Sequence, residues 1–297
     1  MNNKWIWVVA GIFVFILCFF IIVATIVRQA FNGSDDVTVG DGVGVVEVRG
    51  IISDSEETVK QLRDFGKNNR VKAVVLRIDS PGGVVGPSQE IWSAVKDLAK
   101  KKKVVVSMGS VAASGGYYIA APATEIYANP GTITGSIGVL MKFSNIEGLM
   151  RKIGLKSFTI KAGQFKDIGS PDKPMTKQEK EMLQSVIDNT HMQFIKAVAE
   201  GRHIPETEVI KIADGRIFTG EQAMEVKLVD HLGTLQDAIT EAGRLGGIKG
   251  EPKVIRTPKK RNSFLDLLLE RSAGEFGSMM KKEKDFSINY EMQGMGE

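Results

Sequence analysis

The feature that most constrains the fold of this chain is an almost continuous apolar segment, Lys72–Ile78. A strand that is apolar on both faces is typical of parallel sheets, because helices cover both sides of such a sheet. Similar strands are predicted at Val43–Val48 and Val104–Met108, and helices are predicted at Glu56–Lys67 and from about Pro87 to Lys100. Strands and helices therefore alternate along the chain, which predicts an α/β fold with a parallel sheet.

The second half of the chain continues this pattern less regularly. Short strands are predicted at Glu125–Ala128 and Ser157–Ala162. A long helix is predicted to begin after Thr176, because Thr176 and Glu179 have the spacing of a capping box. The helix is predicted to end at Gly201 as its C-cap, since glycine readily adopts the left-handed conformation found there.

The N-terminus carries an uncharged apolar run, Trp5–Val27, which as a helix would reach roughly 35 Å and could span a bilayer. A buried core helix and a cleavable signal peptide are the alternatives. The apolar part of a signal peptide usually has about 7 to 15 residues and precedes an A-x-A-like cleavage site, and this run fits neither condition. We therefore predict an uncleaved transmembrane signal anchor. The flanking charges, Lys4 before the run against Arg28 and several aspartates after it, mildly favour an N-terminus in the cytoplasm.

Composition excludes several classes of protein. The chain has 39 basic and 35 acidic residues, which is too even a balance for a nucleic-acid-binding face. It has three histidines and one cysteine, Cys18, which lies inside the apolar run. The usual zinc ligands are therefore scarce and no disulfide can form within the chain, so that only a metal site of oxygen ligands stays open. We predict no metal, no cofactor and no nucleic-acid partner.

Three glycine-rich segments lie where loops should follow strands, namely Ser80–Gly83, Ala112–Tyr117 and Gly135–Gly138. Such loops often carry functional groups in parallel α/β proteins. In the second segment, Ser114 lies among small residues at a helix start, where the N–H of Gly115 could stabilise an oxyanion. Taken singly, each segment could be a tight turn, and Ser114 could be a helix N-cap. Taken together, they favour a serine nucleophile.

A serine nucleophile needs a base, and the histidines are poorly placed to supply one. His191 lies on the apolar stripe of the long helix, His203 follows the predicted end of that helix, and His231 lies in a predicted turn. A lysine is the other solution, because burial can depress a lysine pKa until the neutral amine accepts the serine proton. Composition does not select one lysine among many.

Four motifs, in this order, resemble those of signal peptide peptidase of the SppA type: SPGG from 80, VSMGSVAASGGYYIAAPA from 106, GTITGSIGV from 131 and KAGQFKDIGSP from 161. The resemblance covers roughly residues 43–231. It implies a ClpP/crotonase-like fold of repeated β-β-α units, here preceded by one N-terminal transmembrane helix.

In that family a serine and a lysine form the catalytic dyad. The matching positions here are Ser114 as nucleophile and Lys166 as general base. Ser136 matches the serine that hydrogen-bonds the catalytic lysine, and the backbone N–H groups of Gly83 and Gly115 match the oxyanion-hole donors.

A second lysine, Lys161, lies in the same motif as Lys166. Lys166 is favoured as the base because it matches the F/Y-K-D pattern of the family. It also lies between Phe165 and Ile168, where partial desolvation is expected.

The resemblance further implies the substrate, the assembly and the location. Family members are serine endopeptidases that degrade signal peptides left in the membrane, and they accept other hydrophobic peptides. Short chains with one protease unit form homo-oligomers whose dyads combine residues of neighbouring subunits. We therefore expect a single-pass protein of a bacterial-type cytoplasmic (inner) membrane, with its catalytic domain on the extracytoplasmic side.

The expected organisation has four parts: a transmembrane anchor at 1–28, a linker at 29–42, a protease domain at 43–250, and a C-terminal helix and flexible tail at 251–297. Three alternatives share parts of this description. They are a membrane serine protease of the stomatin-partner type, a crotonase-like acyl-CoA enzyme, and a catalytically inactive scaffold that keeps the crotonase fold.

Overall fold

The computed structural model describes residue 13 and residues 15–21, 40–257 and 289–291. The chain divides into two units, Met1–Val39 and Gly40–Glu297. In the first unit the described residues are helical and exposed. No helix within the described ranges is long and apolar enough to cross a membrane. Most of the predicted anchor, Trp5–Val27, lies outside the described residues, as does most of the predicted C-terminal helix and tail.

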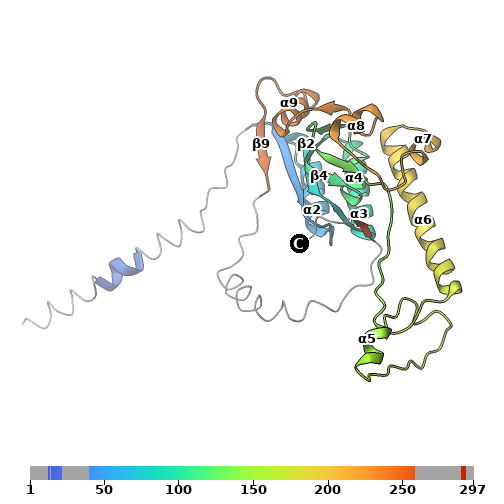
Figure 1. Ribbon diagram of the computed structural model, residues 1–297. Coiled ribbons are helices and arrows are strands. Elements are labelled where there is room, and N and C mark those ends of the chain that lie inside the picture. The colour runs from blue at the N-terminus through green and yellow to red at the C-terminus, as the bar shows by residue number, and fades with distance from the viewer. Residues whose placement is uncertain (1–12, 14, 22–39, 258–288, 292–297) are drawn as a thin grey trace, which may run out of the picture. The chain divides into compact units, whose positions relative to one another are not determined.

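An eight-stranded sheet organises the second unit (Figure 1). Its main strand order is β7-β6-β4-β2-β1-β9, and β5 pairs with both β4 and β8. Neighbouring strands are parallel, with β6 and β7 as the antiparallel exception. The strands are β1 (Gly42–Arg49), β2 (Val71–Ser80), β4 (Lys103–Ala113), β5 (Glu125–Ala128), β6 (Ile133–Gly135), β7 (Ile217–Phe218), β8 (His231–Leu232) and β9 (Lys253–Arg256).

Helices cover both faces of this sheet, because strand β2 has apolar side chains on both of its faces. Val74, Leu76 and Ile78 of β2 pack into the larger core, with α2, α3 and α4. Ala73 and Val75 point the opposite way and pack with α9. The predicted parallel α/β fold is thus confirmed. The helices are α2 (Glu56–Lys67), α3 (Val85–Ala99), α4 (Gly115–Ala120), α5 (Glu147–Lys152), α6 (Lys177–Arg202), α7 (Glu206–Ile210), α8 (Gly220–Glu225) and α9 (Leu235–Leu245).

Strand β4 is longer than predicted and pairs with three other strands. It pairs with β2 along one edge, and on its other edge it pairs with β5 over Val105–Ser107 and with β6 over Val111–Ala113. A separate two-stranded antiparallel sheet joins β3 (Gly82–Val84) to β10 (Asn289–Glu291). The last residues of β4 therefore lie between β2 and β6, where the glycine-rich segments begin.

Helix α6 begins as predicted but ends two residues later. Thr176 and Glu179 form the predicted capping box. Gly201 lies inside the helix, and His203, with φ of 54°, is the left-handed C-cap. The predicted cap was wrong because Gly201 serves packing instead, since a Cβ on it would lie 2.4 Å from the carbonyl oxygen of Ala121.

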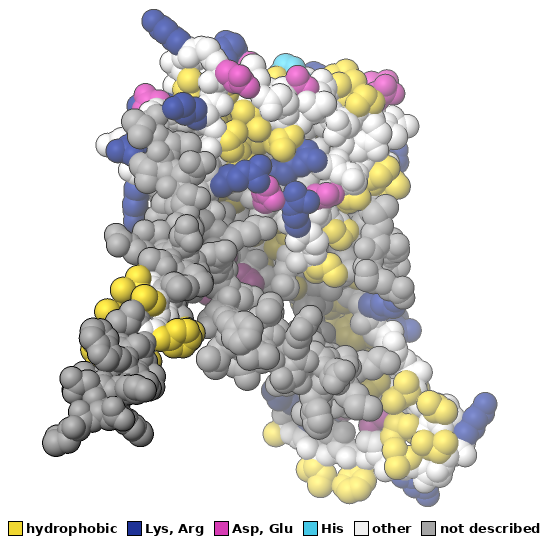
Figure 2. All heavy atoms as spheres, turned by 90° about the vertical axis from the view of Figure 1, so that its left-hand side faces the viewer, with side chains coloured by type: hydrophobic (Ala, Val, Ile, Leu, Met, Phe, Trp, Pro, Cys, Tyr) yellow, Lys and Arg dark blue, Asp and Glu magenta, His cyan; other side chains and the backbone are white. Residues whose placement is uncertain are grey.

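Residues 141–176, here called the projecting segment, extend away from the sheet between β6 and α6 and include α5 (Figure 1). The strand predicted at Ser157–Ala162 does not form. Phe158 and Ile160 of that stretch are 86% and 93% exposed, so the described chain offers the stretch no cover. Hydrophobic side chains gather at the surface of this projection, at the lower right of Figure 2.

Candidate active site

The three glycine-rich segments meet at the carboxyl ends of neighbouring strands. β2 pairs with β4 up to Ser80 and Ala112, and β4 pairs with β6 up to Ala113 and Gly135. Gly116 packs on the first segment, since a Cβ on it would lie 2.7 Å from the carbonyl oxygen of Ser80. The three segments therefore form one surface at the edge of the sheet where ligands of open α/β folds bind.

Ser114 occupies the sharp turn between β4 and α4. Its φ of 52° is an uncommon, strained value for a residue with a side chain. The N–H of Ser114 donates to the carbonyl oxygen of Gly135 at 2.8 Å, and the residue is 1% exposed. Although Ser114 is the N-cap residue of α4, its hydroxyl makes no capping hydrogen bond, nor any other within the described part of the chain. A serine held on a strained strand-to-helix turn is the geometry of a nucleophile elbow.

The two backbone N–H groups predicted to stabilise an oxyanion belong to Gly115 and Gly83. Gly115 is the first residue of α4, so its N–H has no acceptor within its own helix. Gly83 lies in β3 against Ile52, whose carbonyl oxygen accepts a hydrogen bond from the N–H of Val84 at 2.8 Å. A Cβ on Gly83 would lie only 2.2 Å from that oxygen. Gly83 therefore brings two backbone segments together, a role for which its sequence motif held no signal.

Ser136 repeats the backbone geometry of Ser114 one strand further along the sheet. Its φ is also 52°, and its N–H donates to the carbonyl oxygen of Arg216 at 2.8 Å. Ala113 and Gly135 are paired, so the serines that follow them are neighbours at the sheet edge. Two buried serines on strained turns thus lie side by side.

Lys166 does not lie with these serines. It is exposed and belongs to the projecting segment, between α5 and the start of α6, whereas Ser114 lies in the core between β4 and α4 (Figure 1). Its amine has no hydrogen bond or ion pair within the described ranges. In a single chain Ser114 and the N–H of Gly115 are therefore adjacent, whereas Lys166 lies in a separate segment.

A strand from the end of the chain lies next to this surface. β10 pairs with β3 in antiparallel register, with Tyr290 opposite Gly83. This strand lies in the region where a flexible tail is predicted from the sequence.

Comparison with known proteins assigns the family. The model of peptidase family S49 matches residues 96–249, and that of Clp protease matches residues 48–132. The chain belongs to peptidase family S49. The first match contains Ser114, Ser136 and Lys166, and the second contains Gly83. This S49 member is a serine peptidase, and its mixed α/β fold with a parallel sheet is consistent with that of Clp proteases.

Individual relatives agree with this assignment. A protein named as a putative protease in Methanocaldococcus jannaschii is 43% identical over 77% of this chain and 72% of its own length. A Synechocystis sp. protein with the same kind of name is 45% identical over 72% of this chain and 79% of its own length. An Enterococcus faecium protein named as a putative signal peptide peptidase SppA is 33% identical over 80% of each chain.

The lysines near Lys166 in this S49 peptidase are engaged in ion pairs. Lys161, the alternative base, binds the carboxylate of Asp167. Lys173 lies 3.0 Å from the same carboxylate and 2.7 Å from that of Glu179, and the hydrogen bonds that it donates to Glu179 and Asp167 raise its pKa. Carboxylates therefore bind the amines of Lys161 and Lys173, whereas the amine of Lys166 has no such partner among the described residues. The sequence showed Asp167 beside Lys166 in the F/Y-K-D pattern but assigned it no role.

The histidines have contacts elsewhere in the fold. His203 caps α6, and the ring of His231 stacks on Tyr127 with Nε2 3.4 Å from Oε2 of Glu125. His191 lies on α6, where its Nε2 is buried without a hydrogen-bond partner among the described residues. None of these contacts involves Ser114, in line with the inference that a histidine base is poorly placed.

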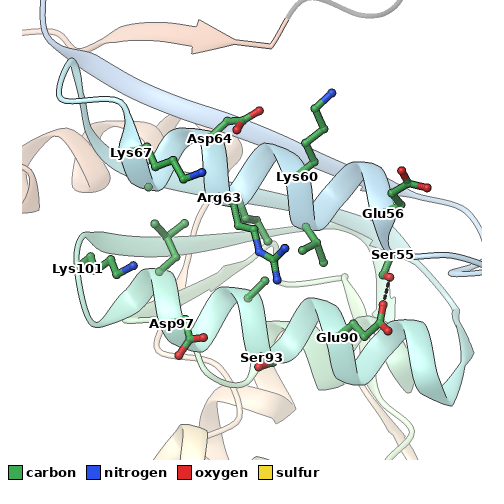
Figure 3. Close-up of a pocket in the computed structure, with 15 residues that line it drawn as sticks. Ser55, Glu56, Lys60, Arg63, Asp64, Lys67, Glu90, Ser93, Asp97 and Lys101 are labelled. Atoms are coloured by element: carbon green, nitrogen blue, oxygen red, sulfur yellow. Dashed lines mark hydrogen bonds between the residues drawn. The ribbon is translucent and has the colours of Figure 1, made fainter.

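A pocket between α2 and α3 lies outside the candidate site (Figure 3). Four acidic and four basic side chains line it, so it favours neither sign of charge. On its rim, Glu90 accepts a hydrogen bond from Ser55. None of the residues assigned to the candidate active site lines this pocket.

Proposed function

We propose that this S49 peptidase is a membrane-anchored serine endopeptidase that degrades cleaved signal peptides and other hydrophobic peptides, with Ser114 as nucleophile and Lys166 as general base. The observation that carries the proposal is the state of Ser114. Its hydroxyl is free of the capping bond that its position allows, on a strained turn beside the N–H of Gly115. A purely structural serine at a helix N-terminus would be expected to cap the helix.

The reaction follows from these groups. Neutral Lys166 accepts the hydroxyl proton while Oγ of Ser114 attacks the peptide carbonyl carbon, and the N–H groups of Gly83 and Gly115 stabilise the oxyanion. The peptide C–N bond then breaks as the protonated lysine returns its proton to the leaving amine. Water, activated by the same lysine, hydrolyses the acyl-enzyme ester and restores Ser114. Ser136, next to Ser114 at the sheet edge, donates to the lysine amine and orients it.

We place the dyad between two copies of the chain. Lys166 and Ser114 lie in separate parts of one chain, and Lys166 has no partner among its described neighbours. The projecting segment that carries Lys166 exposes large apolar side chains, which is the kind of surface that packs against another protein. They are Ile146, Leu149, Ile153, Leu155, Phe158 and Ile160. A homo-oligomer would cover this surface and bring Lys166 to the Ser114 of a neighbour.

The substrate and the location rest on two further observations. The apolar run Trp5–Val27 has the length of a membrane anchor. The Enterococcus faecium relative is named as a putative signal peptide peptidase. An anchor with its N-terminus in the cytoplasm places the peptidase unit outside a bacterial-type inner membrane, where it meets signal peptides in the plane of the bilayer.

Mixing of inactive variants tests this proposal. Full-length Ser114→Ala and Lys166→Ala are each expected to lose at least about a thousandfold in turnover of a synthetic signal peptide. Mixed under conditions of subunit exchange, they are expected to regain activity, because one intact Ser114 meets one intact Lys166. Ser110→Ala, an exposed serine of the same strand β4, is the matched control and should remain active.

Each other outcome contradicts a distinct part of the proposal. Activity retained by Ser114→Ala or Lys166→Ala would contradict the dyad, and a wild-type chain without turnover would point to the inactive scaffold. Exchange without regained activity would contradict the shared site. Preference for a soluble unfolded protein over signal peptides would favour a protease of the stomatin-partner type.

A further inference from the structure

The turn that carries Lys166 contains a carboxylate shared by two lysines. Oδ1 of Asp167 accepts a hydrogen bond from Nζ of Lys161, and Oδ2 lies 3.0 Å from Nζ of Lys173. The side chain of Asp167 is only 14% exposed. Hydrogen bonds from Lys161 and then Lys173 lower the pKa of the Asp167 carboxyl. Asp167 is therefore ionised at neutral pH and binds a cation on each side.

Lys173 continues this network into α6. Its Nζ lies 2.7 Å from Oε1 of Glu179, while Oε2 of Glu179 accepts the N–H of Thr176 at 2.8 Å. Glu179 is 3% exposed, and the hydrogen bonds from Lys173 and Thr176 lower its pKa to about 2. Ionic hydrogen bonds thus join the turn to the capped first turn of the helix.

The backbone places Lys166 between these anchors. Its N–H donates to the carbonyl oxygen of Gly163 at 3.2 Å. Lys161, besides binding Asp167, donates to the carbonyl oxygen of Gln164 at 2.8 Å. Asp167, directly after Lys166, is therefore bound by two lysines. On the other side of Lys166, the carbonyl oxygens of Gly163 and Gln164 accept hydrogen bonds.

This arrangement differs from an ordinary surface ion pair. An isolated exposed pair contributes little, because solvent screens it and its side chains are mobile. Here one carboxylate serves two lysines, and the chain of contacts ends on a buried carboxylate in a helix cap. Such a network fixes geometry, and geometry is what a general base requires.

We infer that Asp167 is a positioning residue for Lys166, drawing Lys161 and Lys173 into ion pairs and holding the turn on α6 so that Lys166 presents its amine to Ser114. The inference rests on the proposed Ser114/Lys166 dyad. Asp167 itself touches no reacting atom.

The first test is the kinetics of full-length Asp167→Asn on the synthetic signal peptide. A catalytic group displaced by about 1 Å can lose about a hundredfold in rate, so kcat should fall by about that factor with KM within about twofold. Asp167→Glu, which keeps the charge, should recover part of kcat. The matched control is Glu181→Gln, since Glu181 lies two residues beyond Glu179, is 63% exposed and is 3.7 Å from Lys177. It should leave kcat unchanged.

The second test is complementation between variants. Asp167→Asn mixed with Ser114→Ala should regain activity, because the chain with the intact turn supplies Lys166 to the chain with the intact serine. Asp167→Asn mixed with Lys166→Ala should gain nothing, because no chain in that mixture has an intact turn. Asp167 would thus belong to the same complementation group as Lys166.

The inference is overturned if Asp167→Asn keeps the wild-type kcat, or if KM rises while kcat is unchanged. It is also overturned if Lys166→Ala complements Ser114→Ala and Asp167→Asn does not. If Lys166→Ala fails to complement Ser114→Ala, the shared dyad fails instead, and the kcat and KM of Asp167→Asn decide the role of Asp167.

Discussion

At the scale of single residues, two of the four non-glycine residues with positive φ in the described part of the chain lie where the chemistry is proposed. Ser114 and Ser136 both have φ of 52°, a conformation that costs about 1 to 3 kcal/mol and persists only where neighbours enforce it. Hydrogen bonds from their N–H groups to Gly135 and Arg216 supply that enforcement. Strain that a fold maintains at two adjacent serines is typical of a functional site.

Gly83→Ala should lower kcat more than the small size of the added methyl group suggests. Its Cβ would lie 2.2 Å from the backbone oxygen of Ile52, so β3 must move and the N–H of Gly83 must leave its place. Loss of one oxyanion donor costs about a hundredfold to a thousandfold in kcat. The measurement is kcat on the synthetic signal peptide.

Gly86→Ala is the control for this change. Gly86 lies three residues further on, in α3, and its Cβ would meet nothing within 4 Å. It should keep full activity. Equal losses in the two variants would contradict a specific role for Gly83.

The sequence singles out these residues as candidates but does not contain the contacts that hold them. Ser114 and Gly83 stand out because they lie in glycine-rich segments after apolar strands, which is local information. The value of φ at Ser114 and the contact of Gly83 with Ile52 depend on pairing between distant segments. No pattern along the chain records those contacts.

At the scale of elements, helix α6 links the projecting segment to the core. Its first half is mainly exposed, and its second half buries Phe194, Ile195 and Val198. Its capping box was predictable because Thr176 and Glu179 are close in sequence. The bounds of α2, Glu56–Lys67, also agree with the prediction. The strand predicted at Ser157–Ala162 failed because a strand needs a partner, and β propensity does not supply one.

Glu179→Gln should make the stability of the protein less dependent on acid pH. The pKa of Glu179 is about 2, against 4.5 for the free group, so its charge stabilises the fold above about pH 4.5. That stabilisation is lost as the pH falls from about 4.5 to about 2. Glutamine keeps the capping hydrogen bond but lacks the charge.

The check is the difference in Tm between wild type and Glu179→Gln. The wild type should be more stable at pH 7, and the difference should shrink as the pH falls toward 2. A difference that is constant with pH would contradict the ionic role of Glu179.

At the scale of the whole molecule, the candidate site is divided. The edge formed by β2, β4 and β6 carries Ser114 and leads into Gly115 of α4, and the projecting segment carries Lys166. The motifs predict both residues as the dyad, but the order of the motifs along the chain does not predict that they lie in separate parts of the fold. That separation depends on the path of the projecting segment after β6. The large apolar side chains of this segment are exposed in the described chain.

The length of α6 has a consequence for any site that uses Lys166. Each residue of a helix turns the chain by about 100° and advances it by about 1.5 Å. One alanine inserted between Ser185 and Val186, on the exposed part of α6, would rotate the loop that carries Lys166 by about 100° relative to the core. Activity should be lost while helix content, measured by circular dichroism, is retained. Ser185→Ala, without the insertion, should stay active.

Full activity in the insertion variant would mean that the projecting segment finds its place independently of α6. Loss of activity would mean that α6 sets both the direction in which Lys166 faces and its distance from the core. Relatives with an altered α6 would then have to change its length by whole turns, because only those lengths keep the lysine facing the serine.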